Sequence, residues 1–327
     1  MKTKPEKFLA LGIDTSAYTT SLAIVDQDEK LIIDQRKALP VKTGNLGLRQ
    51  SEAVFAHLSN LPLLLEKCQQ KFDSETIVAV ASAAKPRPVK DSYMPVFKVG
   101  EAFGSLLART MGLFYLASTH QEGHVLAGLW SAGAPEGKYL VLHLSGGTTE
   151  IISAEESSLG HLKLKLLAGS SDLNAGQFID RIGQLMGLPF PAGPALENLA
   201  RSAVGEDLEL PVAVKGSEIS FSGPASQAER LLQKGCDHAA MARAVEKCIA
   251  DSLCRAVSNL DLNIEGYNGL LTVGGVTANC YIKNRLERKL GDWEFYSSST
   301  EYASDNAAGM AVQAARSYKQ EQLIKKE

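Results

Sequence analysis

The stretch KFLALGIDTS (residues 7–16) decides the fold, because it places an apolar strand directly before a turn of small polar residues. The same pattern returns in KYLVLHLSGG (residues 138–147), where the turn is rich in glycine. Alternating apolar residues after each stretch predict two further strands, and so a three-stranded antiparallel meander in each half. The order β-β-β-α-β-α then occurs twice along the chain. This repeat predicts a duplicated α/β fold.

The remaining segments have the apolar spacing of either helices or strands. Ser51 is the expected N-cap of the first helix, and Pro62 is expected to kink it. One long helical region is expected from Pro224 to about Leu260. The expected helices are 51–72, 96–112, 121–133, 175–187, 224–260, 280–291 and 304–323. The expected later strands are 77–86, 113–119 and 293–298, and 269–279 is expected to be a strand that runs into a turn.

A chain of 327 residues is long enough for two domains of ordinary size. We expect an N-terminal lobe at 1–135, a C-terminal lobe at 136–302, and a last helix at 303–327 that returns to the N-terminal lobe. The repeated order resembles the actin, Hsp70 and sugar-kinase superfamily, an analogy at the level of the fold. Two lobes around a cleft are the arrangement that this resemblance implies.

Two turns of small residues are candidates for phosphate binding. LSGGTTE (144–150) and GGVTAN (274–279) both contain glycine pairs, which let backbone N–H groups approach an anion closely. Taken singly, a glycine pair is more often an ordinary tight turn. Two such turns within a duplicated frame favour nucleotide binding.

Composition limits the range of functions. The formal charge of −3 comes from 34 basic and 37 acidic residues, so no overall field attracts nucleic acid, and an RNA partner would need a local basic patch or another subunit. The five cysteines form no CxxC pair and are expected to be reduced thiols in the core. No apolar run is long enough to cross a bilayer and MKTKPEK is polar, so we expect a soluble, cytoplasmic protein without membrane contact.

The motif THQEGH (119–124) is the candidate metal site. His120 and His124 are four residues apart, which places both imidazoles on one face of a helix. Alone, the motif is equally compatible with two structural histidines. A nearby carboxylate would complete a set of two histidines and one acid, which suits Fe²⁺ or Zn²⁺ and leaves positions open for substrate or water.

A zinc protease is disfavoured. In the HExxH motif the Glu directly follows the first His, whereas here Glu122 lies two residues after His120. At ~100° per residue, Glu122 points about 200° away from His120 and is poorly placed as a general base. The other histidines show no partner pattern and are expected to be structural or surface residues: His57, His143, His161 and His238.

A series of motifs runs in order across nearly the whole chain: GIDTSAYTTSLAIV, THQEGH, LSGGTTEI, NAGQFIDRIGQLMGLPFPAGP, SFSG, VGGVTAN and SDNAAGMA. In this order the motifs resemble the TsaD/Gcp family, the catalytic subunit that makes threonylcarbamoyladenosine in tRNA. This family was once labelled an O-sialoglycoprotein endopeptidase. The chemistry that the resemblance implies is transfer of a threonylcarbamoyl group from its adenylate to a tRNA adenosine.

The resemblance also implies site residues. His120, His124 and Asp305 match the ligands of one divalent metal ion, Fe²⁺ or Zn²⁺. The implied nucleotide is ATP, ADP or an acyl-adenylate, the implied acceptor is tRNA, and the implied partner is a protein of the same fold or a second copy. The implied contacts to phosphate or acyl-adenylate are Ser145, Gly146 and Gly147, and the implied contacts to nucleoside and ribose are Asp180, Gly193, Glu197 and Asn279.

Several turns depart from the family pattern and indicate a divergent paralogue. The first turn reads DTSAYTT, with Asp14 in place of the usual Glu, and Asp14 is the one catalytic candidate besides the metal ligands. A glycine-rich stretch has become KPRPVKDSYMPVF (85–97), which adds a basic loop. Thr148 replaces a His and Gln177 an acid, and SFSGPAS (220–226) departs from SFSGLKT.

Two functions of different class remain open. The first is a threonylcarbamoyltransferase or a related acyl or carbamoyl transferase. The second is a metal- and nucleotide-binding scaffold that has lost transfer activity and acts through another subunit. A small-molecule kinase of the same superfamily is disfavoured, because such kinases need a catalytic Asp and have no use for HxxxH.

Overall fold

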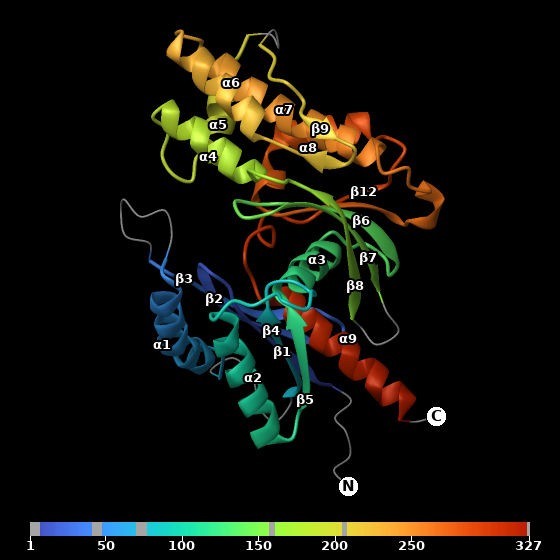
Figure 1. Ribbon diagram of the computed structural model, residues 1–327. Coiled ribbons are helices and arrows are strands. Elements are labelled where there is room, and N and C mark those ends of the chain that lie inside the picture. The colour runs from blue at the N-terminus through green and yellow to red at the C-terminus, as the bar shows by residue number, and fades with distance from the viewer. Residues whose placement is uncertain (1–6, 41–47, 70–76, 157–160, 205–207, 326–327) are drawn as a thin grey trace. The chain divides into compact units, whose positions relative to one another are not determined.

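The computed structural model describes residues 7–40, 48–69, 77–156, 161–204 and 208–325 (Figure 1). The chain divides into two compact units. Unit 1 comprises Met1–Ala134, Glu156–Leu164 and Ser304–Glu327, and unit 2 comprises Pro135–Glu155 and Lys165–Ala303.

The first sheet has the strand order β3-β2-β1-β4-β5. The central strand β1 pairs antiparallel with β2 and parallel with β4, so one sheet combines a meander with parallel strands. Its edge strands are β3, antiparallel to β2, and β5, parallel to β4. The strands are β1 (Leu9–Thr15), β2 (Thr19–Asp26), β3 (Leu31–Ala38), β4 (Ile77–Lys85) and β5 (Phe114–Thr119).

The two faces of β1 meet different helices, because side chains alternate along a strand. Leu11 and Ile13 share a core with α1 (Gln50–Gln69) and α2 (Phe97–Met111). Gly12 lies on the other face, where a Cβ atom would overlap the backbone of Ala307 and Ala311 around the start of α9 (Ala308–Ile324). The close approach of α9 to β1 therefore requires glycine at this position.

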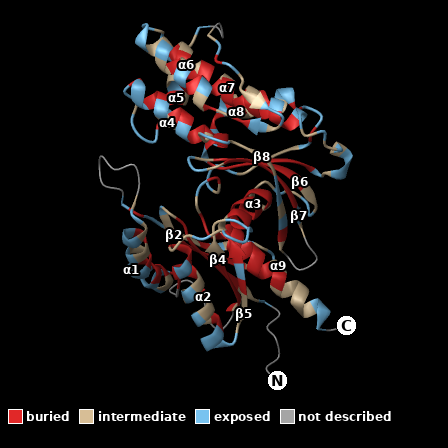
Figure 2. Cartoon of the chain, in the orientation of Figure 1, coloured by how far each residue is buried: buried red, intermediate tan, exposed pale blue. Residues whose placement is uncertain are grey.

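One expectation for α1 needs correction. The helix begins at Gln50, so Ser51 lies inside the first turn and is not the N-cap. Pro62 lies within a helix that continues to Gln69. Further along unit 1, the first half of α9 is buried beside α3 (His120–Ser131), as Figure 2 shows.

The second sheet has the order β12-β11-β6-β7-β8. Its first strand β6 pairs antiparallel with β7 and parallel with β11, as β1 pairs with β2 and β4. The equal order of strands in the two sheets confirms the duplicated α/β fold. The strands are β6 (Lys138–Leu144), β7 (Thr149–Glu156), β8 (Leu162–Gly169), β11 (Gly269–Val273) and β12 (Phe295–Ser297).

The helices of unit 2 pack against this sheet through one apolar core. The expectation of one helix from 224 to 260 is wrong. Two helices form, because Gly235 adopts a left-handed conformation (φ 81°) and Asp237 caps a new helix by accepting a hydrogen bond from Ala240 N at 2.8 Å. The elements are α4 (Ala175–Leu185), α5 (Gly193–Ala200), α6 (Ser222–Gln233), α7 (His238–Ser258), α8 (Cys280–Lys289), the ribbon β9 (Val214–Lys215) and β10 (Glu218–Ile219), and the 3₁₀ turns η2 (Ile264–Gly266) and η3 (Gly275–Ala278).

None of the helices in the described ranges has both the length and the apolar character required to cross a membrane.

Candidate functional site

The helix α3 begins at the end of β5 with a capping box. Thr119 is its N-cap and accepts a hydrogen bond from Glu122 N at 3.2 Å. The Glu122 carboxylate accepts in return from Thr119 N at 3.0 Å and from Thr119 Oγ1 at 2.7 Å. Glu122 is therefore engaged in capping the helix, and this agrees with the expectation that it is no general base for the histidines.

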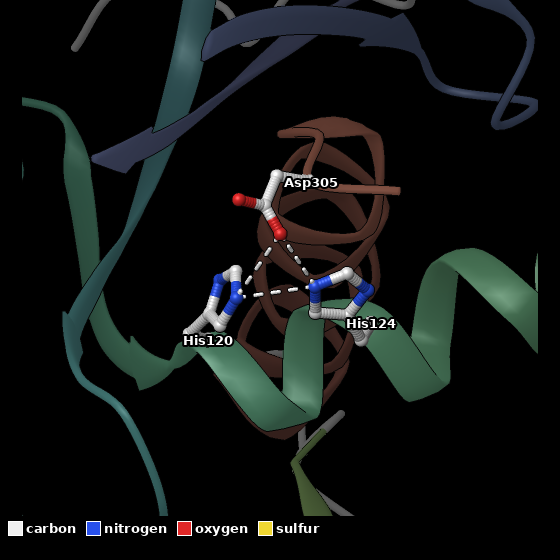
Figure 3. A group of neighbouring side chains, drawn as sticks. All are labelled: His120, His124 and Asp305. Atoms are coloured by element: carbon white, nitrogen blue, oxygen red, sulfur yellow. Dashed lines mark hydrogen bonds and ion pairs between the residues drawn. The ribbon is translucent and has the colours of Figure 1, made fainter. Parts of the chain in front are cut away.

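His120, His124 and Asp305 converge within unit 1 (Figure 3). The His120 Nε2 atom lies 3.1 Å from His124 Nε2 and 3.6 Å from Asp305 Oδ1. The His124 Nε2 atom lies 3.2 Å from the same carboxylate oxygen. Ligand bonds of ~2.1 Å to one divalent ion require donor atoms about 3.0–3.4 Å apart in octahedral or tetrahedral geometry. The three donor atoms thus have the chemistry and spacing of a metal site.

The cluster depends on a close crossing of α3 and α9. Asp305 precedes α9 and is 181 residues from His124, so only tertiary structure can bring them together. A Cβ atom on Gly309 would overlap the carbonyl oxygen of Gly123, and one on Gly123 would come 2.7 Å from Met310 Cε. The two glycines allow the helix backbones to approach closely, and this places the histidines beside the aspartate.

Asp14 contacts the ring nitrogen of His120 that does not face the other two cluster residues. It lies near the end of β1, is almost fully buried, and its Oδ2 lies 2.7 Å from His120 Nδ1. Its Oδ1 is buried without a hydrogen-bond partner among the described residues. A histidine that donates from Nδ1 to a carboxylate keeps the lone pair of Nε2 available for an ion. Asp14 accordingly fixes the orientation and tautomer of His120.

Charges in the cluster shift its pKa values strongly. Burial alone would lower the pKa of His120, but the carboxylates of Asp14 and Asp305 raise it to about 10. Burial would raise the pKa of Asp305, whereas hydrogen bonds and charge from His120 and His124 hold it well below its ordinary value. The two carboxylates thus favour a positive charge within the cluster. The second oxygen of Asp305 accepts a hydrogen bond from Ser16 Oγ at 2.5 Å.

Unit 2 contains a pocket of about 290 Å³ between the turn after β6, α4, α5 and η3. Five of the residues expected at a nucleotide line it, whereas Ser145 and Gly147 belong to the same turn but are not among the lining residues. The five are Gly146, Asp180, Gly193, Glu197 and Asn279.

Close packing shapes the mouth of this pocket. A Cβ atom on Gly176 would come 2.7 Å from Gly146 Cα, so the start of α4 lies directly against the glycine turn. Gly176 N donates to Ser145 O at 3.2 Å and holds the two together. Asp180 accepts a hydrogen bond from Ala192 N at 2.7 Å, and burial raises the pKa of this carboxyl. Hydrogen bonds and close packing within unit 2 therefore hold the walls of the pocket in place.

Asn279 is held by residues that sequence analysis missed. Its Oδ1 caps α8 by accepting from Ile282 N at 2.9 Å, and its Nδ2 donates to Glu246 Oε1 at 2.6 Å. Glu246 is fully buried on α7 and also accepts from Arg243 Nη1 at 2.6 Å. Burial raises the pKa of Glu246 to about 7, although Asn279 and Arg243 act to lower it. No sequence motif marked this acid, because it occupies an ordinary position in a helix.

The sequence comparisons decide the family. A family model described as "tRNA N6-adenosine threonylcarbamoyltransferase" (TsaD) matches residues 31–312. The chain belongs to the TsaD family. Among TsaD proteins, the chain is 30% identical over 317 residues to the tRNA N6-adenosine threonylcarbamoyltransferase of Archaeoglobus fulgidus, covering 95% of this chain and 92% of that protein. It is 31% identical over 312 residues to a protein of the same name from Thermus thermophilus, covering 94% of this chain and 92% of that protein.

Solved structures support the fold of this TsaD-family chain. Component A of the Acidaminococcus fermentans (R)-2-hydroxyglutaryl-CoA dehydratase aligns with a TM-score of 0.59 at 14% identity, covering 96% of this chain and 99% of that one. The activator of the Clostridium difficile 2-hydroxyisocaproyl-CoA dehydratase, solved with bound ADPNP, gives 0.56 at 13% identity, with 98% of each chain covered. These likenesses confirm the actin/Hsp70/sugar-kinase fold class. The family match confirms the resemblance to TsaD proteins.

Proposed function

We propose that this chain transfers a threonylcarbamoyl group from its adenylate to an adenosine of tRNA. The family match supports tRNA threonylcarbamoyltransferase activity at the level of the family. The observation that carries the proposal for this chain is the convergence of three donor atoms of His120, His124 and Asp305 within 3.6 Å.

The donor set fits one divalent ion, Fe²⁺ or Zn²⁺. Two imidazoles and one carboxylate oxygen are a ligand set of both ions and leave further positions open. When bound, such an ion supplies a Lewis acid that can polarise a carbonyl oxygen. Asp14 is almost fully buried and bonds to His120, so we assign it a positioning role instead of direct catalysis.

The unit 2 pocket is the proposed nucleotide site, for ATP, ADP or the acyl-adenylate. The glycine turn at Ser145–Gly147 leaves room for phosphates, because a Cβ on Gly146 or Gly147 would meet no atom within 4 Å. Gly146 N is the proposed donor, since Ser145 N and Gly147 N already donate to Thr148 O and Ser145 Oγ. Glu197 and Asn279 line the pocket and are the proposed contacts to the ribose or base. Because internal contacts hold the walls of this pocket, we assign its residues the role of binding and orienting the nucleotide.

A scaffold that has lost transfer activity is the second candidate. Substitutions at family turns favour it: Thr148 replaces a His, Gln177 replaces an acid, and 85–97 replaces a glycine-rich stretch. Under this hypothesis the metal and nucleotide sites are kept and the chemistry is lost.

A protein of the same fold, or a second copy, is the proposed partner. Apolar side chains on α1 and α2 support it, since Phe55 is 73% exposed and Leu106 is 67% exposed. An apolar groove of about 260 Å³ lies between these helices, lined in part by Leu61, Leu65 and Phe103. Light scattering of the purified chain, alone and with a candidate partner, tests this assignment.

Three measurements test the proposal in sequence. Elemental analysis and Zn²⁺ titration examine the metal site, with His124→Ala as the variant expected to lose the ion. Calorimetry with ADP examines the pocket, with Glu197→Ala as the variant expected to bind more weakly. Formation of threonylcarbamoyladenosine from tRNA and a threonylcarbamoyl-adenylate source examines transfer. A folded wild type that binds neither metal nor ADP overturns both candidates, and binding of both without transfer supports the scaffold.

A further inference from the structure

A buried histidine on α1 adjoins the turn that contacts Asp305. His57 is fully buried, and its Nε2 lies 2.9 Å from the backbone oxygen of Ser16. Its Nδ1 lies 2.8 Å from Thr20 Oγ1. The ring is absent from the metal cluster, and its sequence surroundings show no ligand motif.

The partners of His57 determine its tautomer. A backbone carbonyl can only accept, so Nε2 carries the hydrogen and donates to Ser16 O. Nδ1 then accepts the hydroxyl hydrogen of Thr20, whose oxygen in turn accepts from Asn60 Nδ2 at 3.1 Å. Burial lowers the pKa of His57, in keeping with a neutral ring. The result is a directed chain of hydrogen bonds from Asn60 to the backbone of Ser16.

This series of hydrogen bonds continues from Ser16 into the metal cluster. The Ser16 hydroxyl donates to Asp305 Oδ2 at 2.5 Å, which leaves Oδ1 directed at the two cluster histidines. Ser16 is itself almost fully buried, and its backbone oxygen is held by His57. Rotation of the carboxylate would break the bond from Ser16, so the position of Ser16 sets the direction of Oδ1.

We propose that His57 is a positioning residue of the metal centre, which holds Ser16 so that its hydroxyl orients Asp305 toward the ion. The inference rests on the proposed metal site. His57 touches neither ion nor substrate in this account, and it acts through two hydrogen bonds in series. Residues that orient metal ligands in this way typically change metal affinity by about 10–100-fold when replaced.

The first test measures Zn²⁺ affinity of the metal-free full chain with His57→Phe and His57→Gln. Phenylalanine keeps a ring of similar size and removes both hydrogen bonds, so we expect Zn²⁺ affinity to fall by about tenfold or more. Glutamine retains an N–H donor for Ser16 O, so it should restore most of the affinity. ADP affinity in unit 2 should stay unchanged in both variants. His238→Gln, an exposed histidine of unit 2, is the matched control for adventitious metal binding.

A double-mutant cycle separates positioning from general loss of stability. Because His57 acts through Ser16, His57→Phe combined with Ser16→Ala should bind Zn²⁺ no more weakly than the weaker single variant. If the losses of Zn²⁺ binding free energy in the two single variants add in the double variant, the proposal is overturned. If His57→Phe does not fold, Thr20→Val takes its place, because it keeps the side-chain shape and removes the hydroxyl that orients the ring.

The outcomes distinguish this inference from the proposed function. A wild type that binds no Zn²⁺ overturns both. A wild type that binds Zn²⁺, with His57→Phe and Thr20→Val binding it equally well, overturns the role of His57 alone. Loss of affinity in His57→Phe with recovery in His57→Gln supports it.

Discussion

The α3 and α9 helices cross at a pair of glycines, where a Cβ atom on Gly309 would overlap the carbonyl oxygen of Gly123. Gly309→Ala must therefore push the helices apart, which moves Asp305 away from the histidines. We expect Zn²⁺ affinity to fall about tenfold and stability to fall by about 1–3 kcal/mol. Metal titration and chemical denaturation measure the two effects. Gly223→Ala is the control, because a Cβ there meets nothing within 4 Å, and unchanged Zn²⁺ affinity in Gly309→Ala would contradict the argument.

Metal binding should depend on pH. The pKa of His120 is raised to about 10, so a bound ion must displace a proton at neutral pH. Zn²⁺ affinity should therefore fall about tenfold for each pH unit between about 8 and 6. Asp14→Asn removes the largest raising influence on His120, so this variant should show a shallower slope. Zn²⁺ titrations in non-chelating buffers at several pH values measure this slope. A Zn²⁺ affinity of the wild type that does not change with pH would exclude proton displacement.

Asn279 combines a role in the fold with a proposed role in the pocket. Asn279→Ala removes the cap of α8 and should lower stability by about 1 kcal/mol. Asn279→Ser keeps a capping oxygen, so most of this stability should return. Both variants lack the amide and should bind ADP more weakly than the wild type by calorimetry. If Asn279→Ser binds ADP as tightly as the wild type, the Asn279 side chain acts in the fold and not in ADP binding.

Glu246 should make stability depend on pH. Its pKa is raised to about 7 from an ordinary 4.5, so the folded state holds a proton that the unfolded state has already lost between these values. The contribution of this group to the free energy of unfolding therefore decreases as pH rises from 4.5 to about 7 and is constant above that. The total decrease is on the order of 3 kcal/mol.

Denaturation at several pH values tests this sign with Glu246→Gln as the reference. The amide does not titrate, so the difference in stability between wild type and variant should change across the same window. A difference that is independent of pH would show that Glu246 stays ionised beside Arg243 in the folded protein.

Most of the fold is predictable from the sequence because apolar periodicity and the repeated strand-and-turn pattern are local signals. The break between α6 and α7 was not predicted, although Gly235 and Asp237 are the residue types that end and start helices. The short helix α5 escaped notice because its eight residues carry too little periodicity.

The candidate site, like the fold, was predictable from the sequence only in part. The spacing of His120 and His124 marked a shared helix face, whereas Asp305 came only from the family resemblance, since no local pattern joins residues so far apart. No motif marked His57 or Glu246, since each is polar within an apolar helix pattern. Distant residues hold each side chain: Ser16 and Thr20 bond to His57, and Asn279 bonds to Glu246, which also accepts from Arg243 on its own helix.

The two sheets share one strand order, yet the turns after their equivalent first strands carry different groups. The end of β1 brings Asp14 and Ser16, whose side chains hydrogen-bond to residues of the cluster, whereas β6 leads into a turn of small residues, Ser145, Gly146 and Gly147. Under the proposed function, the first strand end serves a cation and the second an anion. One frame used twice thus provides two chemically different sites.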